Sequence, residues 1–313
     1  MGFLTRFVGF LLLLTALAVA ARRLTERATA IPPPGPGQRD TVVDGVRWRS
    51  REIAGERGET VVYVHGFLSS SAVWRKILTT ASAGRPAIAV DLPGSGFSDR
   101  PWPYDYTVGA QALHFWRYLD ARQIRRVVLV GNSLGGAVAL IAAAARPDRV
   151  AGLVLVDAPS PRAAIPWQFR VMRAPVSGEI EMELLCRPVM ELALRHRVYA
   201  NAERVTSETV SAWWDPVPVP GTRRAALAAI RSSRRGYEDV ASRITAPTLV
   251  LWGKEDRMLP LSAGVSLAQE IPGARFVALP GAGHVPQEET PEAFAGTFAE
   301  FLRTLRPPDA NLP

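Results

Sequence analysis

One serine in the sequence has the surroundings that a nucleophile needs. Ser133 lies in Gly131-Asn132-Ser133-Leu134-Gly135-Gly136, which matches the pattern Gly-x-Ser-x-Gly. An apolar run that ends at Val130 precedes this segment, and an alanine-rich run over 137–145 follows it. The glycines two positions before and after Ser133 leave room for a sharp turn from which a hydroxyl can project. We therefore predict that Ser133 is a nucleophile on a strand-to-helix turn.

A hydroxyl becomes a useful nucleophile only when a base accepts its proton. His284 follows the apolar run 275–279 in a glycine-rich loop, so we predict that it is this base. The other histidines are weaker candidates. His65 directly follows an apolar run and is interpreted as a loop-shaping residue, whereas His114 and His196 lie in helical patterns.

An imidazole that acts as a base needs an acid that fixes its tautomer and stabilises its charged form. Asp256 follows the apolar run 247–252 and is the predicted partner. Asp157, directly after the run that ends at Val156, is a rival for the same role. The neighbouring Glu255 is interpreted as a solvated loop charge.

Attack on a carbonyl group places negative charge on an oxygen, and this oxyanion needs N–H donors. The backbone N–H of Leu134, at the start of the predicted helix, is the first predicted donor. The second is expected from the loop after Val64, and we assign it to the backbone N–H of Phe67.

Secondary structure has to bring these residues together. Short apolar, β-branched runs predict strands at 60–64, 87–91, 126–130, 152–156, 247–252 and 275–279. Longer helical patterns occur at 107–121, 134–145, 261–270 and 291–305. This alternation predicts a parallel α/β sheet that is covered on both faces. Because right-handed crossovers place the strand carboxyl ends on one edge, the candidate residues should meet there.

Five motifs in this order and spacing resemble the α/β-hydrolase superfamily. They occupy residues 65–67, 91–99, 131–136, 253–256 and 281–284. The resemblance implies a doubly wound, mostly parallel sheet of about eight strands, with a helical cap inserted after the sixth strand at about 160–239. It also implies a serine hydrolase of the esterase or lipase type, in which the loop 91–99 has a structural and not a catalytic role.

The activity that these residues predict is hydrolysis of a small apolar carboxylic ester through an acyl-enzyme. Ser133, His284 and Asp256 would form the triad, and no cofactor would be needed. Dehalogenases and epoxide hydrolases of this superfamily carry a carboxylate at the nucleophile position, so the serine disfavours both. Carbon–carbon bond hydrolases of ring-cleavage products do use a serine and are an alternative, although Val285 stands where many of them have tryptophan. A non-catalytic, ligand-binding member is a second alternative, which the intact set of triad residues disfavours.

The expected cap is rich in arginine and in bulky apolar residues, namely Trp167, Phe169, Met172, Trp213 and Trp214. These side chains could line an apolar substrate pocket or form the core of the cap itself, and both interpretations stay open. A cap arginine could also hold an acidic substrate. Cys186 has no neighbouring base and is expected to pack, not to react.

The composition argues against several other classes of function. A chain of 313 residues with 48% hydrophobic and 21% charged residues is a globular protein of enzyme size. One cysteine and four scattered histidines predict no metal site. The formal net charge of +8 comes almost entirely from arginines spread along the chain, so we interpret it as compositional bias and predict no nucleic-acid partner.

The N-terminus is expected to lie outside the folded body. The apolar run 7–21 has Arg6 before it and two arginines after it, so residues 1–23 predict a signal peptide or a membrane anchor. We therefore expect an exported or membrane-anchored protein, and the sequence leaves cleavage of this segment open. A Pro/Gly-rich linker is expected over 24–40. The hydrolase core is expected over 41–159 and 240–306, around the cap, with a tail at 307–313.

Overall fold

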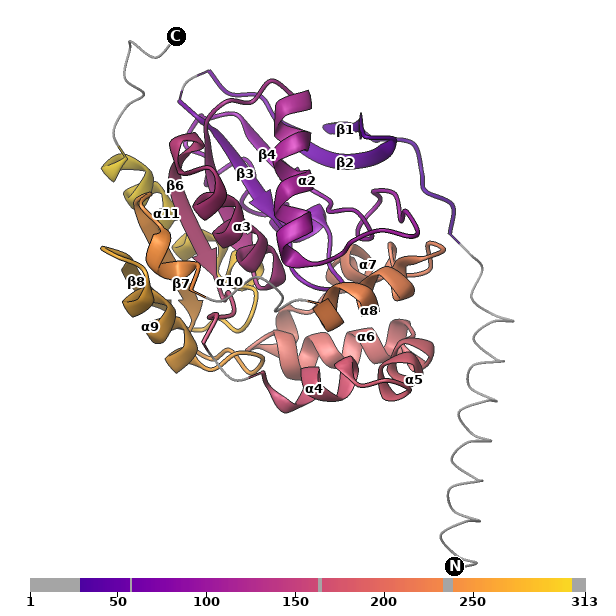
Figure 1. Cartoon of the computed structure of the whole chain (residues 1–313). Helices are drawn as coiled ribbons and strands as arrows, with labels where there is room; N and C mark the ends of the chain where they lie inside the picture. Colours follow the sequence, from indigo (N-terminus) through magenta and orange to yellow (C-terminus); the bar gives the residue numbers. More distant parts are fainter. Residues whose placement is uncertain (1–28, 57, 163–164, 233–238, 306–313) are drawn as a thin grey trace, which may run out of the picture.

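The computed structural model describes residues 29–305, except residues 57, 163–164 and 233–238. Its strands form one eight-stranded sheet in the order β1-β2-β4-β3-β5-β6-β7-β8 (Figure 1). They are β1 (Gln38–Val43), β2 (Val46–Ile53), β3 (Thr60–Val64), β4 (Ala87–Val90), β5 (Val127–Asn132), β6 (Val150–Val156), β7 (Thr248–Gly253) and β8 (Arg275–Leu279). β2 is antiparallel to β1 and β4, whereas the pairs from β4 to β8 are parallel. The expected mostly parallel α/β sheet is confirmed.

The antiparallel strands β1 and β2 have no counterpart among the apolar runs. They form a hairpin through Asp44 and Gly45, both of which have a positive φ. An antiparallel edge pair keeps one face in water, so its strands lack the continuous apolar run of a buried parallel strand. β1 also begins at Gln38, within the segment that we expected to be linker.

Helices cover the sheet on both faces. Phe115 of α2 (Val108–Ala121), Leu140 of α3 (Leu134–Ala145) and Leu267 of α9 (Leu261–Glu270) belong to one buried cluster. Phe294 and Phe298 of α11 (Pro291–Thr304) belong to the cluster on the other face. The short helix α10 (Pro286–Glu289) precedes α11. Short helical turns are η1 (Ser71–Trp74), η2 (Pro147–Arg149), η3 (Leu194–Val198), η4 (Ala202–Arg204) and η5 (Ala241–Arg243).

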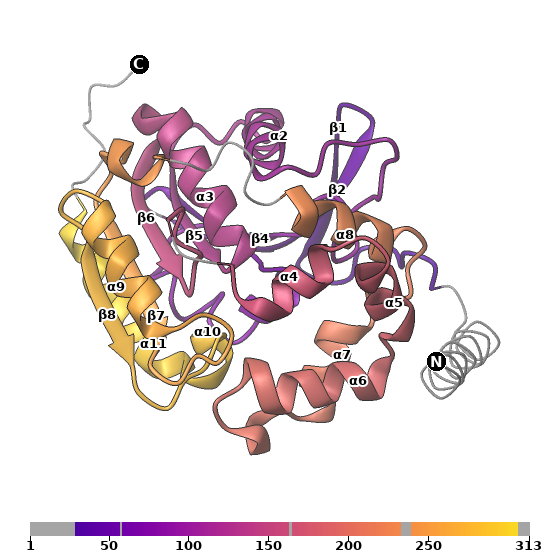
Figure 2. The same cartoon turned by 60° about the horizontal axis from the view of Figure 1, so that its bottom comes forward.

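The described residues between β6 and β7 include five α-helices, and we call the segment between these two strands the insertion. The helices are α4 (Trp167–Arg173), α5 (Ser177–Leu184), α6 (Arg187–Ala193), α7 (Ser207–Trp214) and α8 (Thr222–Ser232). Figures 1 and 2 show the insertion beyond the ends toward which β6 and β7 point. It therefore lies over the edge of the sheet at which the predicted site residues follow their strands.

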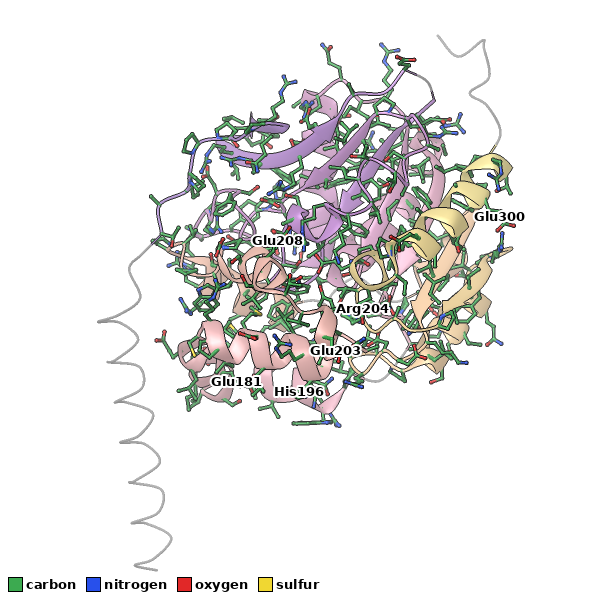
Figure 3. All side chains as sticks on the ribbon, turned by 180° about the vertical axis from the view of Figure 1, so that it is seen from behind. Glu181, His196, Glu203, Arg204, Glu208 and Glu300 are labelled. Carbon is green, nitrogen blue, oxygen red and sulfur yellow. The ribbon has the colours of Figure 1, made fainter. Side chains whose placement is uncertain are left out.

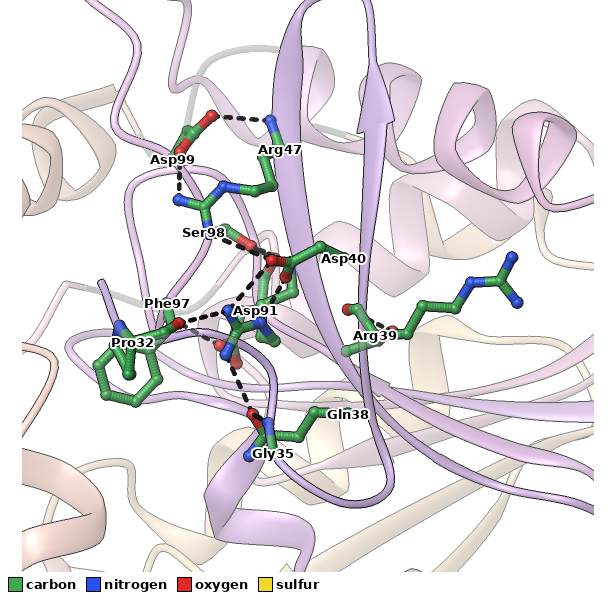
Figure 4. A network of polar contacts seen from close by, with 12 residues as sticks. Pro32, Gly35, Gln38, Arg39, Asp40, Arg47, Asp91, Phe97, Ser98 and Asp99 are labelled. Atoms are coloured by element: carbon green, nitrogen blue, oxygen red, sulfur yellow. Dashed lines mark hydrogen bonds and ion pairs between the residues drawn. The ribbon is translucent and has the colours of Figure 1, made fainter. Parts of the chain in front are cut away.

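The described part of the expected linker is held against β2. Arg49 is only 1% exposed and donates from Nη2 to Pro32 O at 2.8 Å and from Nη1 to Gln38 Oε1 at 3.0 Å (Figure 4). Its guanidinium also pairs with Asp40. Within the described ranges no helix is long and apolar enough to cross a membrane. The expected signal peptide or anchor at 1–23 and the tail at 307–313 lie outside the described residues.

Candidate active site

Ser133 lies on the turn between β5 and α3. Its φ of 52° and ψ of −122° are values that residues other than glycine rarely adopt. Two hydrogen bonds stabilise this strained backbone conformation. The Ser133 N–H donates to Val156 O at 2.9 Å, and Gly136 N–H donates to Ser133 O at 2.8 Å. The turn therefore fixes the direction in which this side chain leaves the backbone.

The glycines beside Ser133 are required by close backbone contacts. A Cβ on Gly131 would lie 2.4 Å from Gly135 O, and a Cβ on Gly135 would lie 2.3 Å from Val64 O. Neither backbone oxygen can move without shifting a strand or a helix. The spacing of the motif thus has the steric origin that the sequence suggested.

His284 and Asp256 form a buried pair. His284 Nδ1 lies 2.8 Å from Asp256 Oδ2, and their side chains are 7% and 0% exposed. The other carboxylate oxygen, Oδ1, accepts from the N–H of Met258 at 2.6 Å and of Leu259 at 3.1 Å. The carboxylate is therefore fixed, and it selects the tautomer of His284 that has its proton on Nδ1 and a free lone pair on Nε2.

Asp157 lies beside this pair but does not contact the imidazole in the same way. It is fully buried, its Oδ1 accepts from Gly253 N–H at 2.9 Å, and its Oδ2 has no hydrogen-bond partner among the described residues. Burial, together with the negative charge of Asp256, raises the pKa of Asp157 well above its ordinary value. Protonation of Asp157 is therefore favoured, and the structure pairs His284 with Asp256.

Asn132 connects the serine turn with the histidine loop. Its Nδ2 donates to His284 O at 3.1 Å and to Val156 O at 3.2 Å. The side chain is buried, so these bonds replace the water that it would otherwise bind. Our sequence analysis gave Asn132 no role, although a buried amide next to a candidate nucleophile is a signal of such a connection.

Acidic side chains hold the histidine loop in place. Glu255 Oε2 accepts from Gly281 N–H at 2.9 Å and from Ala282 N–H at 3.2 Å. Glu255 is exposed, as we expected of a solvated loop charge, and its carboxylate also binds this loop. Glu289 Oε1 accepts from Gly283 N–H at 2.6 Å, next to His284.

Glu288 is a second acid that the sequence analysis missed. Its side chain is completely buried and accepts from Arg75 Nη1 and from the Tyr199 hydroxyl. Burial raises the pKa of Glu288 to about 7, although Arg75 opposes this shift. Two adjacent acids, four and five residues after the candidate base, were the available signal.

Ser133 opens into a cavity of about 350 Å³ between the core and the insertion. Its lining is mostly apolar and includes Ile165, Phe169 and Ile230 of the insertion segment and Ala137, Leu259 and Ala263 of the core. Phe67 and Leu134, the two predicted oxyanion donors, line the same cavity. Among the described residues neither backbone N–H donates a hydrogen bond, so both are available to a ligand.

The bulky residues of the insertion divide among three environments. Phe169 lines the cavity, whereas Trp213 and Trp214 are buried and Met172 packs against the same core cluster. Trp167 is 62% exposed and belongs to neither group. The half-buried Cys186 also packs against the core cluster.

The remaining histidines and the loop 91–99 have structural contacts. His65 Nε2 accepts from Leu92 N–H at 3.2 Å, so Nδ1 carries the proton and donates to Gly66 O at 2.8 Å. Burial lowers the pKa of His65, which keeps it neutral. Asp91 accepts from Phe97 N–H at 2.8 Å, which closes the loop 91–99.

His114 and His196 lie outside the site. The ring of His114 stacks on Tyr104 at 4.9 Å, and His196 is exposed on the insertion. Three donor groups that could hold a metal ion do lie together, within 4.8 Å of one another: Asp157, Asp256 and His284. A metal there would have to displace the hydrogen bond between His284 and Asp256.

Comparison with known proteins gives one family. A family model described as alpha/beta hydrolase fold matches residues 59–291. The 2-hydroxy-6-oxo-2,4-heptadienoate hydrolase of Pseudomonas putida is 30% identical over 254 residues, which cover 78% of this chain and 89% of that protein.

Two solved structures at 26% identity are also similar. A thermophilic esterase from Thermogutta terrifontis has a TM-score of 0.71 and covers 85% of this chain and 98% of its own. A membrane phospholipase A, described as a novel bacterial virulence factor, has a TM-score of 0.64 and covers 96% of this chain and 95% of its own.

Proposed function

Because the chain belongs to the α/β-hydrolase family, with one relative named a hydrolase and one similar structure named an esterase, we propose that it cleaves a carboxylic ester through an acyl-enzyme. One arrangement carries this proposal: Ser133, on a strained turn, opens into an apolar cavity, and its neighbour Asn132 is hydrogen bonded to the backbone of His284, which pairs with Asp256. Asn132 links the two parts of this arrangement. The similar esterase structure supports ester chemistry.

In the proposed reaction Ser133 Oγ attacks the ester carbonyl carbon while His284 Nε2 accepts the hydroxyl proton. The backbone N–H groups of Phe67 and Leu134 stabilise the oxyanion, and Asp256 stabilises the imidazolium. The bond to the alkoxy group then breaks, and the alcohol leaves with the proton from His284. Water, deprotonated by the same imidazole, attacks the acyl-enzyme and releases the acid and Ser133. The scheme uses no cofactor.

The cavity indicates the kind of ester. Its lining is dominated by aliphatic and aromatic side chains, with polar groups near Ser133 and at Ser262 and Ser266. A site of this composition gains affinity by removing apolar surface from water, so we propose an ester with an apolar acyl or alkyl group.

A fluorophosphonate probe tests the nucleophile, because it reacts with an activated serine and not with an ordinary one. We expect labelling of the wild-type chain, loss of labelling in Ser133→Ala, and full labelling in Ser262→Ala, which removes another serine from the same cavity. Circular dichroism checks that each variant is folded. A folded wild-type chain that is not labelled would contradict the proposal and favour a ligand-binding member of the family.

Carbon–carbon bond hydrolysis is the second candidate, because a relative at 30% identity is named 2-hydroxy-6-oxo-2,4-heptadienoate hydrolase. Arg173 lines the cavity, and a guanidinium group suits an acidic substrate. If this candidate holds, Arg173→Gln should lower kcat/KM for a 2-hydroxy-6-oxo-dienoate at least about tenfold while hydrolysis of a neutral ester changes little. Arg170→Gln, on the exposed side of the same helix, is the matched control. Equal losses of kcat/KM in Arg173→Gln for the dienoate and for the neutral ester would contradict an anion-binding role of Arg173.

We also propose that residues 1–23 export the chain or attach it to a membrane. The apolar run 7–21 between arginines supports this, as does similarity to a protein named membrane phospholipase A over 96% of this chain. Mass analysis of the N-terminus from the native host tests it. A cytosolic protein that keeps Met1 and stays out of the membrane fraction would contradict the proposal.

A further inference from the structure

Most of the exposed large apolar side chains among the described residues lie in the insertion. Ten large hydrophobic side chains are exposed among the described residues, and six of these lie on α4, α5, α6 or their connections. We call these six the cap outer face: Trp167 (62% exposed), Val171 (40%), Val176 (69%), Leu184 (38%), Val189 (43%) and Leu192 (60%). Figure 2, which turns this end of the molecule forward, shows α4, α5 and α6 at the end of the insertion. Single exposed hydrophobic residues are ordinary, whereas a cluster indicates an interaction surface.

Helix α4 separates this face from the catalytic cavity. Trp167 and Val171, one turn apart, are exposed, whereas Phe169 and Arg173 line the cavity beside Ser133. Side chains two positions apart on a helix point about 200° apart, so these two pairs lie on opposite sides of α4. A partner on the cap outer face would therefore lie one helix away from the substrate cavity.

Two arginines, Arg170 and Arg197, are exposed beside the face, and two of the nearby acids are already ion-paired. The acids Glu179 and Glu191 are ion-paired, with Arg231 at 2.7 Å and with Arg195 at 2.9 Å. Arg197 is exposed and lies over the Trp167 ring, 5.7 Å from its centroid.

The remaining charged groups differ in their exposure. Arg170 is exposed on α4 and forms no ion pair with a carboxylate within the described part of the chain. Glu181 and Glu183 of α5 are half-buried and therefore less accessible to a partner than Arg170. Figure 3 shows Glu181 and His196 on the insertion side of the molecule. Apolar side chains next to unpaired arginines match the chemistry of a phospholipid surface, which offers acyl chains and phosphates.

The path of the chain also brings this end of the molecule toward a membrane. Thr29 N–H donates to Pro218 O, in the connection between α7 and α8, at 3.4 Å, so the described chain begins against the insertion. Residues 22–28 separate Thr29 from the apolar run 7–21. Seven extended residues span at most about 25 Å. A bilayer that holds the apolar run would therefore lie within this distance of the insertion.

We propose that the cap outer face lies on the surface of a phospholipid bilayer. Trp167 and Leu192 would lie among the upper acyl chains, while Arg170 and Arg197 would contact lipid phosphates. The docking surface uses the proposed membrane attachment through residues 1–23 but does not depend on the proposed ester hydrolysis. Its consequence for substrate does: combined with ester hydrolysis, the contact would give the cavity access to esters dissolved in the membrane.

Site-specific fluorescence in the full chain tests the contact. With Cys186→Ala as background, an environment-sensitive fluorophore is attached at Leu192→Cys or at Val42→Cys, an equally exposed position on β1 of the core. The labelled chains are incorporated into vesicles of phosphatidylethanolamine and phosphatidylglycerol at about 3:1, with and without a nitroxide on the lipid acyl chains. We expect a blue shift and quenching by the nitroxide at position 192, and neither effect at position 42.

Two outcomes would overturn the proposal. In the first, the fluorophore at position 192 stays as accessible to aqueous iodide in vesicles as the one at position 42. In the second, position 192 is shielded without any lipid and light scattering gives twice the mass of one chain, which would assign the face to a second copy.

Activity separates this proposal from the proposed function. Val189→Ser with Leu192→Ser should lower hydrolysis of a long-chain ester in vesicles at least about fivefold and leave hydrolysis of a water-soluble ester unchanged. Val42→Ser with Leu113→Ser removes the same number of exposed apolar side chains from the core and should change neither rate. A wild-type chain that is quenched by the lipid nitroxide but cleaves no ester would defeat only the proposed function. Unchanged vesicle hydrolysis in the first variant would defeat the docking proposal.

Discussion

Asp157 and Asp256 follow neighbouring parallel strands and lie in one buried cluster with His284, yet only Asp256 is hydrogen bonded to the imidazole, at 2.8 Å. Two carboxylates at this separation cannot both be ionised in a buried site without a large cost. The backbone N–H groups of Met258 and Leu259 stabilise the charge on Asp256. Protonation is therefore favoured at Asp157, whose Oδ2 is free of other partners among the described residues.

This difference predicts that the same Asp→Asn substitution has a large effect on kcat at position 256 and a small one at position 157. Asp256→Asn should lower kcat by about 10⁴, because an amide selects the wrong imidazole tautomer. Asp157→Asn should retain kcat within about threefold, because an amide replaces a neutral acid of the same shape and its oxygen can still accept from Gly253 N–H. Steady-state kinetics on a soluble ester measures both. An inactive Asp157→Asn with an active Asp256→Asn would assign the acid to Asp157.

The serine turn predicts a steric effect at Gly135. Gly135→Ala should lower the free energy of unfolding by about 1–3 kcal/mol or more, because the new Cβ would lie 2.3 Å from Val64 O. Gly296→Ala is the matched control in α11, where an added Cβ meets nothing within 4 Å and should stabilise the helix by about 0.5–1 kcal/mol. Urea unfolding gives both values. Equal stability of the two variants would show that the turn tolerates a side chain at 135.

Glu288 predicts a dependence of stability on pH. Its pKa is raised from 4.5 to about 7 by burial, so the folded chain keeps a proton that the unfolded chain loses. The stability that this group contributes is complete below about pH 4.5 and declines as the pH rises to about 7. Glu288→Gln cannot lose this proton, so its stability should decline less steeply over this window, by up to about 1.4 kcal/mol per pH unit.

Urea unfolding at several pH values between 5 and 8 measures this slope. Glu300→Gln is the control, because Arg275 holds the pKa of the exposed Glu300 below its ordinary value and outside the window. The control should keep the slope of the wild-type chain. If Glu288→Gln also keeps that slope, the carboxyl of Glu288 is ionised across the whole window.

Much of the fold could be predicted because it depends on local patterns. The runs at 60–64 and 275–279 match β3 and β8, and the helical patterns at 134–145 and 261–270 match α3 and α9. Continuous apolar runs and helical periodicity reflect burial on both faces of the sheet. β1 and β2 carry no such pattern, since an antiparallel edge pair leaves one face in water.

The sequence could predict which residues lie at the strand ends, and therefore near the candidate site, but not the contacts that each of them makes there. Ser133, His284 and both aspartates follow predicted strands, and parallel connections place all strand ends on one edge. This rule does not distinguish Asp157 from Asp256, because their strands are neighbours in the sheet.

The amino-acid sequence by itself determined the order of the parallel strands and of the helices between them, the tight turn at Ser133 and the group of residues at the sheet edge, since each depends on residue types close together in the chain. The tertiary structure alone decided which aspartate pairs with His284, that Asn132 joins the serine turn to the histidine loop, and that Phe169 lines the cavity while Trp167 faces outward. These outcomes depend on hydrogen bonds and burial between segments that are distant in the chain, and local sequence patterns do not encode such contacts.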